Sequence, residues 1–131
     1  MSKVYTVSRF LLGIIFVVFG SNGLMMVLTG SGFIPMPTDI PADVMEKMGA
    51  FFKLGYLMPL VKSLQVISGL LLLSNRYVNL AIIFLGPIVL NILLVHIFID
   101  LSGLPMAVII SILLGLVIKS RWNDLKVILK A

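Results

Sequence analysis

The sequence contains no cysteine and only one histidine, His96. Without thiols, the chain cannot itself carry out thiol-disulfide exchange, bind zinc through thiolates or ligate an iron-sulfur cluster. One histidine without a second ligand also makes a poor metal site. We therefore predict no metal site and no built-in cofactor, so any electron transfer would require a partner protein or a bound molecule.

Charged residues are scarce, at 11% of the chain, whereas 60% of the 131 residues are hydrophobic. The mean hydropathy of +1.20 lies far outside the range of an ordinary soluble domain and predicts an integral membrane protein. The net charge of +5 comes from basic residues that lie mostly near the ends of apolar runs. This pattern predicts contact with anionic membrane lipids and argues against nucleic-acid binding.

The apolar residues form four runs, at residues 10–28, 54–73, 77–99 and 104–118. A helix needs about 20 apolar residues to cross a hydrocarbon core roughly 30 Å thick. The first three runs meet this requirement directly, and the fourth can extend into the tail that follows it. The sequence therefore predicts an all-α fold, with residues 1–131 forming one membrane domain built as a four-helix bundle.

Lysine and arginine predict how the bundle is oriented. If the N-terminus is cytoplasmic, seven of the ten basic residues fall on the cytoplasmic side: Lys3, Arg9, Arg76, Lys119, Arg121, Lys126 and Lys130. Lys47 and Lys53 would lie outside, and Lys62 would lie within a span. The positive-inside rule then places both termini in the cytoplasm. The tail, residues 119–131, alternates apolar and basic side chains and is expected to lie as an amphipathic helix on the inner leaflet.

The long connection at residues 29–53 has two parts. Its first half is rich in glycine and proline, which excludes a regular helix, whereas its second half has apolar residues at helical spacing. We expect a short helix that lies flat on the outer membrane surface. Two roles remain open for this helix: a simple interfacial connector, or a lid over a site that opens outward. The lid residues would be Met45, Met48 and Phe52.

Polar residues within the predicted spans gather at one depth. On the oriented helices, they fall in the outer half of the bundle: Asn22, Lys62, Gln65, Asn91, His96 and Ser111, with Asp100 at the outer surface. Polar groups in hydrocarbon need partners or water, because an unmet hydrogen bond there is costly. We therefore predict a shared ligand-binding cluster of Asn22, Lys62, Gln65, Asn91, His96 and Asp100.

Each of these residues also has a structural interpretation. Lys62 could extend its amine outward or form an ion pair with Asp100, and His96 could hydrogen-bond a neighbouring helix. The case for a functional site is that Lys62, His96 and Asp100 lie within one half of a small bundle. Ionisable residues inside a membrane are candidates for function by default.

Three segments carry a family resemblance: RFLLGIIFVVFGSNGL at residues 9–24, YLMPLVKSLQVISGLLLLSNRYVNLA at residues 56–81, and GPIVLNILLVHIFIDLSGLP at residues 86–105. They resemble the DoxX-like family of small four-helix membrane proteins. That resemblance implies a place in, or beside, a membrane oxidoreductase complex, since the family is named after a subunit associated with thiosulfate:quinone oxidoreduction. Members often carry a glutamate where this chain has Gln65, so a proton-accepting role at this position does not transfer.

Three functions are compatible with these features. The first is an accessory subunit of a membrane redox system that binds quinone or another amphiphile, such as a lipid, in an outward-facing polar pocket. The second is a non-catalytic scaffold or assembly factor. The third, a proton-coupled small transporter, ranks last because the first span lacks the embedded acid on which small four-helix multidrug exporters rely.

The expected partners are membrane lipids, redox proteins and further copies of the chain, and the expected location is the bacterial inner membrane. The sequence assigns no catalytic residue.

Overall fold

The computed structural model describes residues 2–130, and its regular elements in that range are all helices, without strands. Its elements, in chain order, are α1 (Lys3–Thr29), α2 (Ala42–Lys53), α3 (Leu57–Ser74), α4 (Val78–Phe98), the 3-10 turn η1 (Leu101–Gly103), α5 (Leu104–Ser120) and α6 (Trp122–Ile128). Four segments are long and apolar enough to cross a membrane: α1, α3, α4, and η1 together with α5. The predicted all-α bundle of four apolar helices is therefore confirmed.

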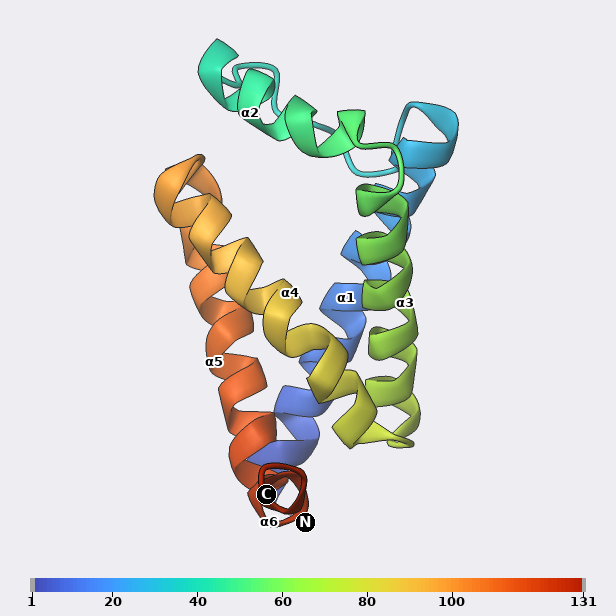
Figure 1. The fold of residues 1–131 in the computed structure, drawn as a ribbon, viewed down its shortest axis with the longest axis vertical. Helices are drawn as coiled ribbons and strands as arrows, with labels where there is room; N and C mark the ends of the chain where they lie inside the picture. Colours follow the sequence, from blue (N-terminus) through green and yellow to red (C-terminus); the bar gives the residue numbers. More distant parts are fainter. Residues whose placement is uncertain (1, 131) are drawn as a thin grey trace.

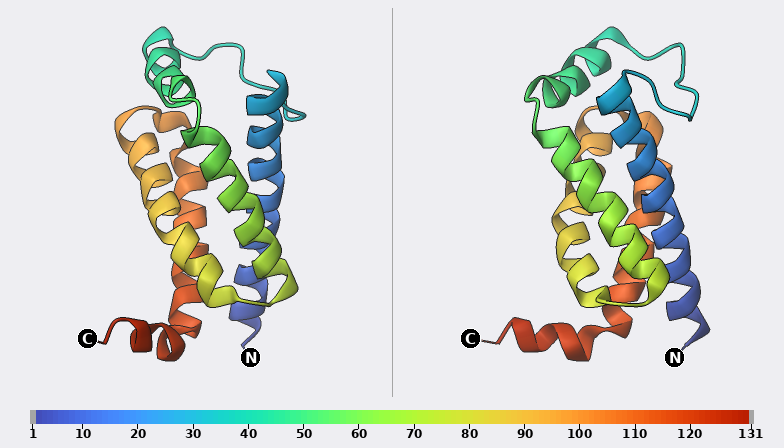
Figure 2. Two further views of the ribbon diagram at one scale, coloured as in Figure 1. Left: turned by 45° about the vertical axis from the view of Figure 1, so that its right-hand side comes forward. Right: turned by 90° about the vertical axis from the view of Figure 1, so that its right-hand side faces the viewer.

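The four long helices pack as a ring in the order α1, α3, α4, α5, with α5 returning to α1. Figure 1 shows that α3 and α4 lie close together at their shared turn and diverge toward the other end, where α2 crosses above them. The chain begins and ends at the end opposite α2. In Figure 2, α6 leaves the bundle sideways at that end. We call the half of the bundle next to α2 the α2 half, and the half next to the chain ends the termini half.

The α1–α3 contact is the tightest in the bundle, because glycines allow the backbones to approach. A Cβ on Gly69 would lie 2.7 Å from Val17 Cγ2 and 2.9 Å from the Gly13 carbonyl oxygen. A Cβ on Gly20 would meet Gln65 Cβ at 3.1 Å. Small residues at such crossings are a common way to pack helices in a membrane.

Most of the buried apolar core lies in the termini half. It includes Leu12 of α1, Leu72 of α3, Val78 and Leu85 of α4 and Val117 of α5, each with no exposed surface. These residues come from the first half of α1 and α4 and from the last half of α3 and α5. Continuous side-chain packing therefore joins the helices near the termini, whereas the α2 half contains the cavities described below.

The helix bounds differ from the predicted spans mainly at the N-terminus. The first run was expected from residue 10, but α1 begins at Lys3, where the Ser2 hydroxyl accepts a hydrogen bond from the Tyr5 amide. The second run was expected from residue 54, whereas α3 begins at Leu57 because Gly55, with φ of +76°, forms the turn after α2. The short helix expected in the long connection is present as α2.

Candidate functional site

A cavity of about 210 Å³ lies between α3 and α4 beneath α2. Its apolar lining is supplied by Met48, Phe51, Leu57, Met58, Val61, Ile92 and Val95. Its polar lining consists of five of the six predicted binding residues: Lys62, Gln65, Asn91, His96 and Asp100. The structure therefore brings these five side chains around one space.

A second cavity, of about 240 Å³, lies among α1, α3, α4 and α5. It shares four lining residues with the first cavity: Lys62, Gln65, Ile92 and His96. We call the two cavities together the chamber. Asn91 is exposed at the α3–α4 side of the chamber, and Phe19 and Met106 are exposed at the α1–α5 side. The chamber thus has polar residues at its centre and reaches the bundle surface between helices.

Lys62 and Gln65 occupy the centre of the chamber, one turn apart on α3. Lys62 Nζ donates a hydrogen bond to Gln65 Oε1 at 3.4 Å. Gly23 of α1 provides the space, because a side chain there would overlap the end of the Lys62 stem. Among residues 2–130, no carboxylate lies within ion-pair distance of Lys62. The amine is therefore held by one neutral amide group.

The contact with Lys62 fixes the orientation of the Gln65 amide. An ammonium group only donates hydrogen bonds, so the amide oxygen faces Lys62 and the NH₂ group faces away from it. Gln65 is 97% buried, with a relative exposure of 3%, and it lines both parts of the chamber. Its amide nitrogen has no hydrogen-bond partner within the described part of the chain. Two N–H donors are therefore available to a bound molecule.

His96 is fixed by the end of its own helix. Its Nδ1 lies 2.8 Å from the carbonyl oxygen of Asp100, and because a carbonyl only accepts, Nδ1 carries the proton. Gly103 packs against the ring so closely that a Cβ at that position would collide with it. In the neutral ring, Nε2 is then an acceptor, and the ring itself lines both parts of the chamber.

The Asp100 carboxylate turns away from Lys62. Its Oδ1 accepts hydrogen bonds from the Ser102 amide at 3.1 Å and from the Ser102 hydroxyl at 2.6 Å, so Asp100 caps η1. The Lys62–Asp100 ion pair considered from the sequence does not form. The physical reason is that Asp100 follows the end of α4 in an extended conformation, with φ of −135°, and this directs its side chain to the next turn.

Asn22 lies apart from the other five predicted residues. Its Oδ1 accepts a hydrogen bond from the Ile34 amide at 2.8 Å, and Gly32 packs against its amide group. Asn22 does not line either part of the chamber. It fastens the glycine- and proline-rich connection to the end of α1.

The three predicted lid residues line a further cavity, of about 370 Å³, directly beneath α2. Met48 also reaches into the chamber and so borders both spaces, whereas Met45 and Phe52 border only the space beneath α2. Phe51, absent from the predicted lid, lines the chamber. The face of α2 that touches the chamber is therefore formed by Met48 and Phe51.

The termini half contains a buried cation that the sequence did not single out. Arg9 is 9% exposed, and its Nη1 donates to the carbonyl oxygens of Leu72 and Leu73 at the end of α3, the second at 3.3 Å. Its guanidinium also lies 5.8 Å from the centre of the Tyr5 ring. Arg9 therefore caps the C-terminal end of α3. The only sequence signal for this capping role is that a charged residue, Arg9, lies between two apolar stretches.

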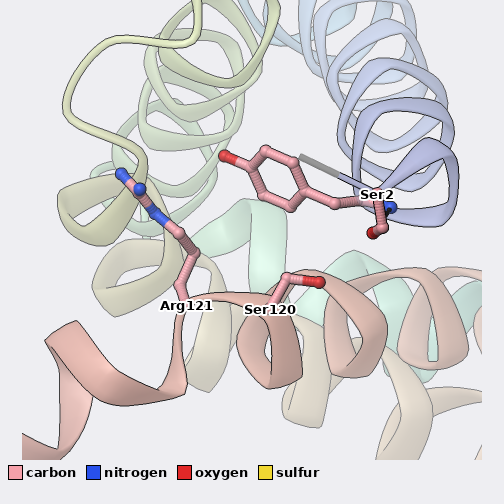
Figure 3. A pocket seen from close by; sticks show the side chains of 4 residues that line it. Ser2, Ser120 and Arg121 are labelled. Carbon is pink, nitrogen blue, oxygen red and sulfur yellow. Dashed lines mark hydrogen bonds between the residues drawn. The ribbon is translucent and has the colours of Figure 1, made fainter.

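A surface hollow of about 270 Å³ lies beside this contact and is lined by Ser2, Tyr5, Ser120 and Arg121. In Figure 3, the Ser2 and Ser120 side chains lie on one side of the hollow, and the Arg121 side chain extends along the other side. Arg121 forms an ion pair with Asp124 at 3.5 Å, and Ser120 donates to its own helix at Leu116. The polar groups of this hollow are largely occupied by local contacts.

Within residues 2–130, no group of three His, Cys, Asp or Glu side chains is arranged to hold a metal ion. Comparisons with protein-family models, curated proteins and solved structures give no match. The resemblance to the DoxX-like family therefore stays a prediction, and the functional argument rests on the chamber.

Proposed function

We propose that the protein is a small integral membrane protein that binds quinone or another amphiphile in the chamber, as an accessory subunit of a membrane redox system. The observation that supports this proposal most directly is the meeting of two cavities at Lys62, Gln65 and His96. Small-molecule sites are typically apolar hollows with a few convergent polar groups, and the chamber has this composition.

The polar groups match an oxygen-bearing headgroup. Lys62 and the free NH₂ of Gln65 donate to carbonyl or hydroxyl oxygens, and His96 Nε2 accepts from a hydroxyl. The apolar lining from α2, α3 and α4 suits the chain attached to that headgroup. A ligand dissolved in the bilayer would enter sideways between α3 and α4, past Asn91.

The proposed setting is the bacterial inner membrane, with both termini cytoplasmic and α2 on the outer surface. The four apolar helices and the basic termini half support this orientation. Any electrons would be exchanged with a partner redox protein, and the role of the chain would be to position the amphiphile. Further copies of the chain are additional candidate partners in the membrane.

Native mass spectrometry of the protein purified in mild detergent tests the proposal. We expect the wild type to retain a small molecule that is lost or reduced in Lys62→Met and His96→Leu. Ser68→Ala is the matched control, because Ser68 is fully buried on the same helix and lies outside the chamber lining. Unchanged retention in both chamber variants, each still folded, would refute binding in the chamber.

A scaffold or assembly factor is the second candidate, and a specific observation favours it. Asn22 and Asp100 accept hydrogen bonds from backbone amides of nearby loops and turns, and His96 donates to the Asp100 carbonyl, as structural residues do. If the chamber variants keep their bound molecules, pull-down of partner proteins from solubilised membranes becomes the deciding measurement. Loss of a specific partner from the Asn22→Leu variant would then support the scaffold.

A further inference from the structure

The centre of the chamber presents hydrogen-bond donors without a negative charge to balance them. Lys62 supplies an ammonium group and Gln65 supplies an NH₂ group, and the only described contact between them uses the amide oxygen. The remaining N–H groups of both side chains are available to the chamber. A buried cation normally has a paired anion or several oxygen acceptors, and Lys62 has one neutral acceptor.

No charged group on the elements around Lys62 fills this role. On α4 and the following turn, His96 and Asp100 are the ionisable residues that line the chamber, and the Asp100 carboxylate is held by Ser102. The lining residues from α1, α2 and α5 are all apolar, and η1 contributes only Gly103. The acidic residues of α2, Asp43 and Glu46, are exposed and do not line the chamber. Within residues 2–130, no carboxylate forms an ion pair with Lys62, and Asp100, the one carboxylate in the chamber lining, is bound to Ser102.

We propose that the chamber ligand is an anionic single-chain amphiphile of the fatty-acid type, whose carboxylate binds Lys62 Nζ and the Gln65 amide nitrogen. This inference rests on the proposed function and names the ligand class for the same site. Charge-assisted hydrogen bonds to a carboxylate are stronger than those to a neutral carbonyl, so the chamber selects the acid over an uncharged relative.

The position of the ligand's hydrocarbon chain follows from the arrangement of the lining residues. The donors lie at the centre of the chamber, and Val61, Val95 and Leu57 line the cavity on the α3–α4 side, toward α2. A carboxylate at Lys62 therefore leaves its hydrocarbon chain among these side chains, with Asn91 exposed at the opening. The cavity of about 210 Å³ holds the carboxylate and the first part of one chain, and the rest of the chain lies outside the cavity, at the bundle surface.

A competition experiment tests the proposal. The protein is reconstituted in nanodiscs of neutral phosphatidylcholine, and binding of radiolabelled lauric acid is measured by scintillation proximity. Unlabelled lauric acid and dodecanol, which share a chain and differ in headgroup charge, serve as competitors. We expect lauric acid to compete about 30-fold more strongly than dodecanol.

Two variants sharpen the experiment. Gln65→Glu places a carboxylate beside Lys62, so an internal ion pair replaces the ligand, and Lys62→Met removes the cation. Both are expected to weaken lauric acid binding by about 30-fold and to weaken dodecanol binding much less, because the hydroxyl group of dodecanol carries no charge. Arg121→Gln is the control for acid bound by the basic termini half, and it should leave lauric acid binding unchanged. Size-exclusion profiles confirm that each variant is folded.

The outcomes separate this inference from the proposed function. If lauric acid and dodecanol bind alike and both lose affinity in a His96→Leu variant, the chamber binds amphiphiles but the anionic class is wrong. If neither competitor binds, the fatty-acid class is wrong, and the native mass spectrometry of the wild type and the chamber variants decides the proposed function. If lauric acid is preferred but Gln65→Glu and Lys62→Met bind it normally, or Arg121→Gln abolishes binding, the acid lies elsewhere and the proposal is overturned.

Discussion

Arg9 and Lys62 are both buried or half-buried cations on long apolar helices, yet their surroundings differ. Arg9 donates to two backbone carbonyls at the end of α3 and lies beside the Tyr5 ring. Lys62 has one amide oxygen at 3.4 Å and borders two cavities. A cation that donates to backbone carbonyls of a neighbouring helix serves the fold, whereas one that contacts a single amide oxygen and borders two cavities is available to a ligand.

The packing around the two cations differs in the same way. Arg9 lies next to the continuous apolar core of the termini half, which includes Leu12 and Leu72. Lys62 lies near the start of α3 and lines the cavity beneath α2. Figure 1 shows that α3 and α4 have diverged at this end of the bundle. Stability and binding are therefore assigned to opposite halves of the bundle, and substitutions in the two halves should affect different measurements.

The largest effect is expected from Gly69→Val. Because a Cβ there would lie 2.9 Å from the Gly13 carbonyl oxygen and the Val17 amide nitrogen, the added side chain must separate α1 from α3. We expect a loss of about 3 kcal/mol in the free energy of unfolding, measured by circular dichroism during SDS titration of detergent-solubilised protein. Gly115→Val is the control, since no atom lies within 4 Å of its Cβ position. Equal effects of the two variants would contradict the tight α1–α3 contact.

The next largest effect separates the two cations directly. Arg9→Met keeps the apolar stem but removes the hydrogen bonds to Leu72 and Leu73, and we expect it to lower the free energy of unfolding by about 2 kcal/mol. Lys62→Met removes a cation that has no carboxylate partner, so its stability should equal or exceed that of the wild type. The same SDS titration gives both values. If Lys62→Met lowered the free energy of unfolding more than Arg9→Met does, Lys62 rather than Arg9 would be the cation that stabilises the fold.

A smaller effect is expected at the end of α4. Asp100→Ala removes both hydrogen bonds to Ser102, and loss of such a cap costs about 1 kcal/mol. Its binding of lauric acid should not weaken, because the Asp100 carboxylate does not pair with Lys62 and its loss removes a negative charge from the cavity lining. Ser102→Ala, which removes only the hydroxyl contact, should cost less. A loss of ligand affinity as large as that of Lys62→Met would show that Asp100 belongs to the binding centre.

The smallest effect concerns α2. Met48→Ala removes apolar contacts from the chamber lining and should weaken lauric acid binding by about fivefold. Met45→Ala is the matched control, because Met45 is 59% exposed and does not line the chamber. Both affinities come from the scintillation assay. Equal affinities of the two variants would show that α2 does not contribute to the binding site.

The sequence predicts the helices well, because run length and composition alone identify a span. The predicted depth of Lys62, Gln65 and His96 also places them together, since depth follows from position along each span. The sequence could not predict the direction in which side chains point at the ends of helices. Asp100 turns to Ser102 because α4 ends in an extended residue, and Asn22 binds Ile34 because the connection folds back onto α1.

The role of Arg9 was missed for a related reason. Its acceptors are carbonyl groups at residues 72 and 73, and a backbone carbonyl carries no sequence signal. The predicted first span therefore begins at residue 10, after the charged Arg9, whereas α1 begins at Lys3. Predicting this contact would require knowing that α1 packs on α3, which depends on glycines that face each other only in the folded chain.

The Arg9 contact also has a consequence for biosynthesis. The carbonyls that bind Arg9 lie 63 and 64 residues later in the chain, so they do not exist when α1 leaves the ribosome. Until α3 has been made, the guanidinium lacks these acceptors, and in a membrane it would need water or lipid headgroups in their place. We therefore expect the first helix to reach its final position only after the second long helix has been made.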